Sequence, residues 1–359
     1  MGNLKQILEV AVTGMLLVCF SASVHAQSQP PGTNAGRISE TVRTVPFLEG
    51  RYGEVMADWD RGYVLDHSIE INYSSGTPMV VMYDKTGKRI REGRIWPQGA
   101  GSVRIRRTAA TRDGAILAGG WATLKDGSTP GYIAKTDLAG TTVQSVLTGS
   151  FKPAQICEAP DGTIWSLGHS LSPNDGEEHD TNILRHYSFE KGLLHGFLPE
   201  ETVKAVVRSS EPWFEPAFSY LRCGKDRVSV YLNFTDEYVE VDTSSFELKR
   251  WMLDESAVEH GKAGGLAITE DGKVYAYFSA HGASGPQGLT GLFRIKARSG
   301  NPRAELIPVA GSISFADGKR LPSGTVIYLW GADGNQLVVW RVDEGGMSWV
   351  DVIGGEATD

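Results

Sequence analysis

The sequence has 359 residues, of which 43 are glycine, and it carries a formal net charge of −8 at pH 7. An acidic chain in which no run of lysine and arginine exceeds a pair does not favour nucleic-acid binding, which requires basic surfaces. The glycine content is well above the usual share and indicates many turns rather than long helices.

The N-terminus has the pattern of a secretory signal peptide. Lys5 precedes the apolar run Val10–Phe20, and small residues follow up to Ala26. This run is about half the roughly 20 residues that a membrane-spanning helix needs, and no second run of this kind occurs. We therefore expect cleavage near Ala26 and a secreted or periplasmic mature protein without a transmembrane segment.

From residue 50 onward, a polar turn followed by an alternating apolar strand recurs. Its six copies are marked by residues 45 to 65 positions apart: Asp60, Asp113, Asp161, Asp226, Asp271 and Ser323. A second strand and turn trail each copy, which gives two hairpins and four antiparallel strands per copy. A sheet of this size cannot bury both faces alone, so the copies must stack.

Stacking in a closed ring predicts an all-β fold, a six-bladed β-propeller of four-stranded antiparallel blades. A pair of β-sandwiches is the alternative, but it would not need one module six times. The predicted domains are a signal peptide (1–26), an N-terminal extension that could close the ring with an added strand (27–49), and the propeller (50–355).

Two copies of the module carry a family resemblance. Pro160–Trp165 and Leu266–Tyr275, which read PDGTIW and LAITEDGKVY, resemble six-bladed propellers of the NHL and TolB-like type. The resemblance covers about residues 50 to 353. It implies a propeller fold but no particular activity, because the shared positions are turn and core residues.

Two enzyme families of this fold share single features with the sequence. Glu54 resembles the first metal ligand of gluconolactonase-like propellers, but the segments 262–267 and 277–280 lack the Asn and Asp that would follow. Streptogramin-lyase-like propellers use a His pair and a Glu near the axis, and this sequence has only scattered histidines. Neither resemblance extends to a complete site.

The long polar connections are all predicted on one face of the ring, and the other face has only short turns. Binding residues concentrate on long loops carried by a rigid scaffold, so we expect the site on that face. The predicted loops are 72–78, 119–131, 168–182, 233–237, 279–291 and 331–336, with an insertion at 198–216.

Several residues of these loops are candidates for ligand binding. The acidic segment after His169 offers oxygen and imidazole groups for a divalent cation, but it lacks the spacing of an EF-hand loop. Aromatic side chains in loops suggest contact with a sugar or peptide, although packing is the alternative for each. The candidates are Trp121, His169, Asp175, Glu177, His179, Asp180, Trp213 and His281.

The two cysteines of the mature chain, Cys157 and Cys223, leave two alternatives open. An oxidising compartment would permit a disulfide. Because their places in neighbouring repeats are similar but not identical, the sequence favours two buried thiols.

The sequence thus predicts an exported module that binds a protein, peptide or glycan partner through its long-loop face, without catalysis. No cofactor is predicted, although a divalent cation such as Ca²⁺ would fit the acidic loop. The alternative is a metal-dependent hydrolase or lyase at the central opening, with Glu54, His169 and His281 as its catalytic residues.

Overall fold

The computed structural model describes residues 35–44, 55–68, 79–170, 182–199, 219–233, 235–253, 262–279, 291–345 and 347–354. All the regular elements in these ranges are β-strands. None of the residues described belongs to a helix that could cross a membrane. The signal peptide predicted for residues 1–26 lies outside the described residues.

Three sheets each consist of four antiparallel strands that follow one another along the chain. The first contains β2 (Val55–Asp60), β3 (Tyr63–Ser68), β4 (Met79–Asp84) and β5 (Arg89–Arg94). The second contains β6 (Ala100–Ala110), β7 (Ile116–Leu124), β8 (Gly131–Thr136) and β9 (Thr142–Gly149). The third contains β10 (Phe151–Glu158), β11 (Ile164–Ser170), β12 (Asn182–Ser188) and β13 (Gly192–Pro199).

The remaining strands form a 12-stranded sheet composed of three antiparallel runs. One run is β14 (Tyr220–Cys223), β15 (Arg227–Leu232), β16 (Glu237–Asp242) and β17 (Leu248–Leu253). The next is β18 (Lys262–Ile268), β19 (Val274–Ser279), β20 (Gly291–Lys296) and β21 (Arg303–Ala310). The last is β22 (Val326–Asp333), β23 (Gln336–Val342), β24 (Ser348–Ile353) and β1 (Ile38–Thr44). Short parallel contacts join β17 to β21 and β18 to β22. The predicted all-β fold with four-stranded antiparallel sheets is confirmed.

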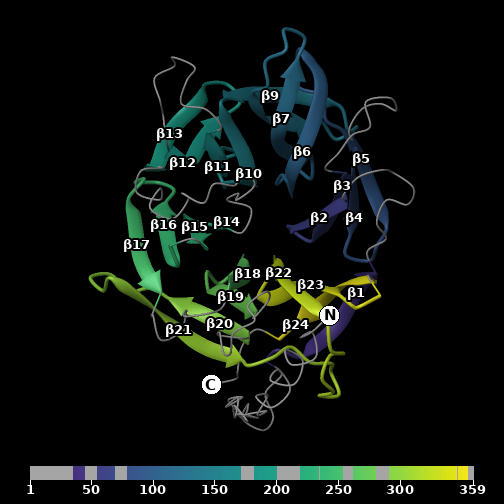
Figure 1. Cartoon of the computed structure of the whole chain (residues 1–359), viewed down its shortest axis with the longest axis vertical. Coiled ribbons are helices and arrows are strands. Elements are labelled where there is room, and N and C mark those ends of the chain that lie inside the picture. Colours follow the sequence, from purple (N-terminus) through teal and green to yellow (C-terminus); the bar gives the residue numbers. More distant parts are fainter. Residues whose placement is uncertain are drawn as a thin grey trace, which may run out of the picture.

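The sheets succeed one another around a common centre, with β2, β6, β10, β14, β18 and β22 innermost (Figure 1). The third sheet shows the contrast in burial between an inner and an outer strand. Every residue of β10 is buried, whereas the outer strand β13 is mostly exposed or half-buried. An inner strand is covered on both sides by neighbouring sheets, so it does not need the alternation of a half-buried strand. This arrangement is that of a β-propeller.

The ring is closed by contact between the first and the last sheet. Trp59 of β2 packs with Trp330 of β22 in one buried cluster, and its Nε1 donates to the Ala332 carbonyl at 3.3 Å. Similar apolar clusters fill the other interfaces between successive sheets. The core is therefore divided among the interfaces rather than gathered in one centre.

The N-terminal strand β1 lies beside β24 near the C-terminus (Figure 1). Thr41 Oγ1 donates to Asp351 Oδ1 at 2.7 Å, and Arg341 Nε donates to the other oxygen of the same carboxylate at 2.5 Å. Asp351 is fully buried. This latch (Thr41, Arg341 and Asp351) ties the two ends of the described chain together.

The hairpin turns that follow β6, β10 and β18 have the predicted Asp-Gly chemistry. In the third sheet, Gly162 has a φ of 82°, which favours glycine, and Asp161 Oδ1 accepts hydrogen bonds from the amide and hydroxyl of Thr163. Such turns need only a few local residues, which explains why the repeat is visible in the sequence.

The sixth copy of the module was predicted one strand too early. Ser323 and Gly324 lie before β22, in the connection from β21, and the true hairpin turn is formed by Gly334 and Asn335 between β22 and β23. Accordingly, 331–336 is not a long loop on the binding face. Asp333 pairs with Lys85 of the β4–β5 turn at 3.3 Å, which places this turn among the short turns on the opposite face.

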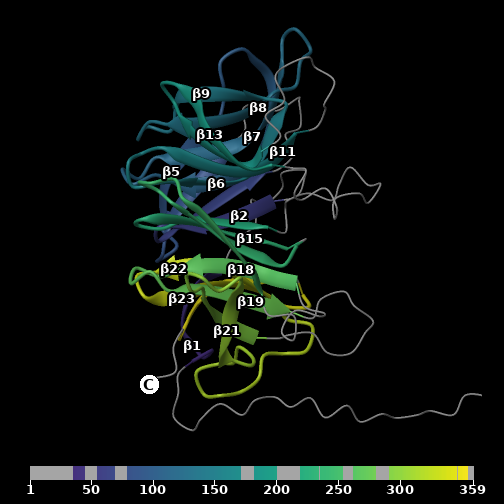
Figure 2. The same cartoon turned by 90° about the vertical axis from the view of Figure 1, so that its left-hand side faces the viewer.

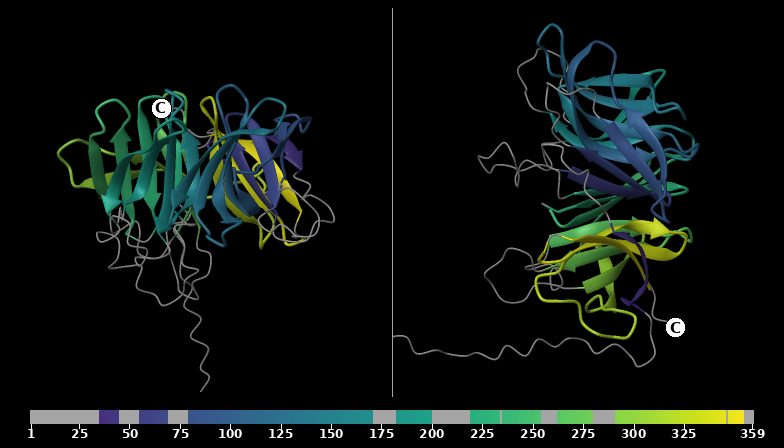
Figure 3. Two further views of the ribbon diagram at one scale, coloured as in Figure 1. Left: turned by 90° about the horizontal axis from the view of Figure 1, so that it is seen from above. Right: turned by 90° about the vertical axis from the view of Figure 1, so that its right-hand side faces the viewer.

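The two faces of the ring are seen from the side in Figures 2 and 3, where the strands run from one face to the other. We call the side with the β2–β3, β4–β5 and equivalent hairpin turns the short-turn face. The side where second strands connect to third strands, and fourth strands to the next sheet, is the long-loop face.

Candidate functional site

Charged and polar side chains gather on three of the inner strands, near the ends of β2 and β14 and on β6. Asp58 and Asp60 come from β2, Arg61 from the turn that follows, Arg107 from β6, and Tyr220 and Arg222 from β14. We call these six residues the axial cluster. Asp60 ends β2, and Arg222 is the last residue but one of β14, so the cluster lies toward the short-turn face.

Asp58 is held by donors from two sheets. Arg107 Nη1 donates to one carboxylate oxygen at 2.9 Å, and the amide and hydroxyl of Thr108 donate to the other at 2.9 and 2.8 Å. His67 Nε2 lies 3.2 Å from that same oxygen. Burial alone would raise the pKa of Asp58, but Arg107 and the hydrogen bond with His67 hold it well below its usual range. Asp58 therefore acts as an anionic connection between the first two sheets.

The pKa of Asp60 is shifted in the opposite direction to that of Asp58. Burial raises its pKa to about 6, although Arg61, Arg222 and the Ala110 amide act against the rise. That amide donates to Asp60 Oδ2 at 3.0 Å. The side chain is still 30% exposed, so the carboxyl can exchange protons with solvent. Asp60 is the group of the cluster that changes charge in weakly acidic solution.

Arg61 spans the ends of two neighbouring inner strands. Its Nε donates to the Ala110 carbonyl at 3.2 Å and its Nη2 to the Glu158 carbonyl at 2.7 Å. The residue has a φ of 51°, in the left-handed region that non-glycine residues rarely adopt. Its Nε is 4.0 Å from Asp60 Oδ2, which is a weak ion pair.

Arg107 is oriented by a second partner besides Asp58. With its amide oxygen turned toward Arg107, Gln155 accepts from Nη2 at 2.9 Å and from Nε at 3.1 Å. The guanidinium thus bridges β2 and β10 from its place on β6. Burial raises the pKa of the nearby Tyr220 to about 12, and the charges of Arg107 and Arg222 act against this rise.

Arg222 differs from the other two arginines. Its Nη1 donates to its neighbour's carbonyl, Leu221, at 2.9 Å, and its Nη2 to the Trp330 carbonyl of β22 at 2.5 Å. Its Nε is buried without a hydrogen-bond partner, and the guanidinium makes no ion pair with a carboxylate in the described ranges. Burial lowers its pKa, while Asp60 and Asp58 raise it.

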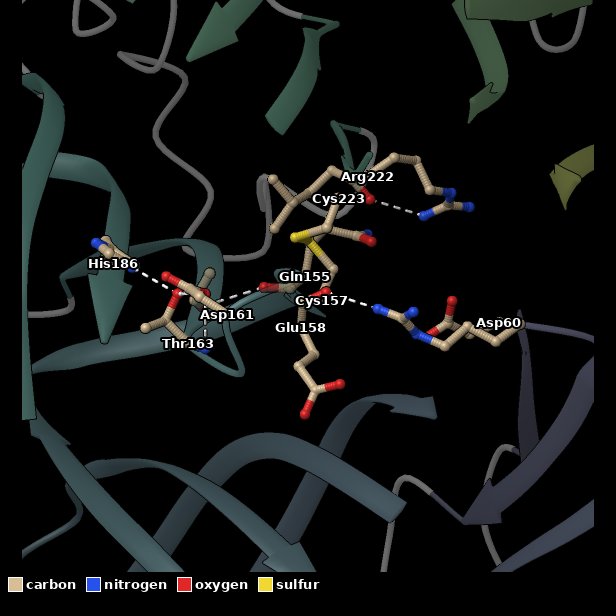
Figure 4. The surroundings of a disulfide bond; sticks show 12 residues. Asp60, Gln155, Cys157, Glu158, Asp161, Thr163, His186, Arg222 and Cys223 are labelled. Atoms are coloured by element: carbon tan, nitrogen blue, oxygen red, sulfur yellow. Dashed lines mark hydrogen bonds and ion pairs between the residues drawn. A yellow bond between two sulfur atoms is a disulfide. The ribbon is translucent and has the colours of Figure 1, made fainter. Parts of the chain in front are cut away.

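A disulfide fixes the strand that carries Arg222. Cys157 of β10 and Cys223 of β14 are bonded, with a Cα–Cα distance of 5.7 Å. The interpretation of two buried thiols was therefore wrong, because the two inner strands bring the cysteines face to face across the sheet interface. Figure 4 shows the bond with Arg222 and Asp60 on one side and His186 on the other.

Two of the predicted binding residues are described. Trp121 lies within β7 and not in a loop, and Arg104 of the paired strand β6 lies over its ring at 5.1 Å. His169 lies in β11, paired with Lys152 of β10. Burial, Arg106 and Lys152 lower the pKa of His169 to about 4, and its Nδ1 is buried without a hydrogen-bond partner.

The other candidates, Glu54, Asp175, Glu177, His179, Asp180, Trp213 and His281, lie outside the described residues. Only His169 of the three residues in the alternative catalytic site is therefore placed. Within the described ranges, no three His, Cys, Asp or Glu side chains are grouped as metal ligands.

The sequence interpretation missed the axial cluster. It used Asp60 only as a turn marker and searched the long-loop face for the site. The available signal was the presence of Asp58 and Arg222 between apolar residues in short strands, because a charged residue in a buried strand needs a partner or a function.

Among known proteins, similarity to this chain is found only with solved structures of low identity. No model of a known protein family matches the sequence. A search of curated proteins finds no similar one.

Among solved structures, a protein of unknown function from Bacteroides caccae is 12% identical, covering 76% of this chain and 91% of its own, with a TM-score of 0.43. A putative exported protein from Bacteroides fragilis is 9% identical over 89% of this chain and 98% of its own, with a TM-score of 0.47. The β-propeller domain of Cps50 (Swd1) from Myceliophteria thermophila is 12% identical over 90% of each chain, with a TM-score of 0.46.

Proposed function

We propose that this chain is an exported six-bladed β-propeller of the NHL and TolB-like type that binds a protein, peptide or glycan partner through its long-loop face. The count of six rests on runs of four antiparallel strands and on the apolar cluster between each pair of successive runs. In this proposal β1 supplies the outer strand of the last blade and thereby closes the ring.

The observation that carries the binding role is the unequal length of the connections at the two faces. On the short-turn face, the longest connection between described strands is 297–302. The long-loop face receives most of the chain between strands, and binding residues concentrate on such connections. Its longer connections are 45–54, 69–78, 171–181, 200–219, 254–261, 280–290 and 311–325.

Export is supported by two independent features. The first is the signal-peptide pattern that ends near Ala26. The second is the Cys157–Cys223 disulfide, because such bonds persist in oxidising compartments and are rare in the cytosol. Expression of the full chain in a Gram-negative host, followed by fractionation and thiol labelling, tests this part. A cytoplasmic protein in which Cys157 and Cys223 are both free thiols would contradict it.

Site-specific photocrosslinking tests the binding face. Lys125, in the β7–β8 connection of the long-loop face, and Lys88, in the β4–β5 turn of the short-turn face, are both exposed lysines. Each is replaced by a photoreactive amino acid in the exporting host. We expect a reproducible protein or peptide adduct from position 125 only, whereas equal adducts from both positions would contradict the proposal.

A glycan array probed with the purified mature protein covers the remaining partner class. Binding to a defined glycan that a Trp121→Ala variant loses would assign the partner as a sugar. If neither the array nor position 125 yields a partner, the long-loop face is not the binding surface.

A further inference from the structure

The axial cluster contains more positive than negative groups. The guanidinium groups of Arg61, Arg107 and Arg222 face the two carboxyl groups of Asp58 and Asp60. Arg107 is neutralised by Asp58 at 2.9 Å, and Arg61 lies at ion-pair distance from Asp60. Arg222 remains without an anionic partner in the described part of the chain. The cluster therefore has a surplus of about one positive charge when both carboxyl groups are ionised.

Arg222 is held so that it cannot move to find a partner. Main-chain carbonyls from β14 and β22 fix both of its Nη atoms. The neighbouring disulfide at Cys223 fixes the strand itself. A buried guanidinium with an unpaired N–H costs stability unless an anion compensates it. The protein thus maintains a preorganised N–H donor and a positive charge at the same point.

Solvent reaches the cluster. Asp60 and Arg61 are 30% and 31% exposed, and Arg107 is 19% exposed. Asp58, by contrast, is already saturated by donors from Arg107, Thr108 and His67. A dissolved cation would find only the carboxyl group of Asp60, which already accepts from the Ala110 amide and lies beside the Arg61 guanidinium. A dissolved anion would instead meet the half-buried side chain of Arg222, whose charge no carboxylate in the described ranges pairs.

We propose that the axial cluster is an anion-binding site, in which Arg222 binds the carboxylate or phosphate group of a small ligand at the centre of the ring. Guanidinium groups suit both anions, because their N–H donors match the geometry of the paired oxygens. The site is separate from the long-loop face and does not depend on the function proposed for it. Asp60 is its internal competitor, because it supplies the negative charge nearest to Arg222.

The proposal predicts opposite effects for two variants. Arg222→Gln removes the positive charge and should weaken anion binding by about tenfold or more, the loss expected for a charged hydrogen bond. Asp60→Asn removes the competing charge but keeps an oxygen that can accept from the Ala110 amide, so it should strengthen binding several-fold at neutral pH. Arg298→Gln is the matched control, because Arg298 is an exposed arginine that pairs only with Glu305.

Isothermal titration calorimetry with inorganic phosphate and with acetate, at an ionic strength kept constant with chloride, measures these effects. Saturable binding of either anion that follows the expected order of variants supports the site, and the stronger of the two identifies the ligand group. Equal behaviour of Arg222→Gln and Arg298→Gln, or no binding beyond that of chloride, would overturn it. If Arg222→Gln does not fold, Asp60→Asn decides: unchanged or weaker binding in that variant refutes the proposal.

Discussion

Replacing Asp60 with asparagine should stabilise the protein at neutral pH. The pKa of Asp60 rises from its ordinary value of 3.8 to about 6 in the folded protein. Ionisation therefore opposes folding, and the folded state binds more protons than the unfolded state between these two values. Stability that this group contributes at low pH is lost as the pH rises through about 6. The asparagine variant does not suffer this loss.

The magnitude follows from the size of the rise. The full difference corresponds to at most about 3 kcal/mol, since one pKa unit is worth about 1.4 kcal/mol. Because 30% of the side chain is exposed, solvent screening reduces this, and we expect about 1 to 2 kcal/mol. The variant and the wild type should be closest in stability at about pH 3, where Asp60 is mostly protonated in both the folded and the unfolded protein, and should diverge as the pH rises to about 7.

Urea unfolding monitored by tryptophan fluorescence, in buffers free of phosphate, measures this difference at each pH. Asp113→Asn is the matched control, because Asp113 occupies the equivalent turn of the second sheet and its pKa is lowered by a hydrogen bond from Thr111. That variant should be destabilised at neutral pH and lose the difference on acidification. The reasoning about Asp60 is refuted if Asp60→Asn is less stable than the wild type at neutral pH or differs from it equally at all pH values.

Three further outcomes are expected. Replacing Cys157 and Cys223 with serine should lower the free energy of unfolding by about 4 kcal/mol, given their separation of 66 residues, and an unchanged urea midpoint after reduction of the wild type would contradict this. In the latch, Asp351→Ala should cost about 3 to 5 kcal/mol by leaving Arg341 buried without its anion, whereas Arg341→Met combined with Asp351→Leu should cost clearly less in the same assay. EDTA and added Ca²⁺ should leave the Tm of the mature protein unchanged, and a shift of several degrees would instead favour the metal-dependent hydrolase or lyase.

Local chemistry explains which parts of the fold could be predicted. The Asp161–Gly162 turn is specified by its own few residues, so the repeat could be found without knowing its partners. Because such turns are specified locally, a similar turn before β22 was mistaken for the hairpin turn of the sixth copy. Gly324 has a φ of 79°, as a turn glycine should, but nothing in that short segment tells which strands it connects. The true turn became visible only through the pairing of β22 with β23.

The axial cluster and the disulfide depend on distant parts of the chain. Asp58 and Arg107 are 49 positions apart, and Arg222 and Trp330 are 108 apart. Their contacts require the register of each inner strand and closure of the ring, neither of which is encoded by spacing. Likewise, Cys157 and Cys223 meet only because β10 and β14 are the inner strands of successive sheets and place the two residues opposite each other.

The axial cluster contains two charged groups that reduce the stability of the folded protein, Arg222 and Asp60. Other inner strands bury charge with compensation: on β10, which is buried along its whole length, the Glu158 carboxylate accepts a hydrogen bond from the Arg112 amide at 2.7 Å. Buried charges can often be replaced by apolar side chains without loss of stability, so the fold alone does not require Arg222 or an Asp60 that resists ionisation. Both costs, together with the left-handed backbone of Arg61, occur at one place around the centre of the ring. Stability that is given up locally, where strain and unpaired groups coincide, is typical of functional sites. We therefore expect the function of the centre to be lost first when Arg222 is replaced, while the surrounding sheets remain folded.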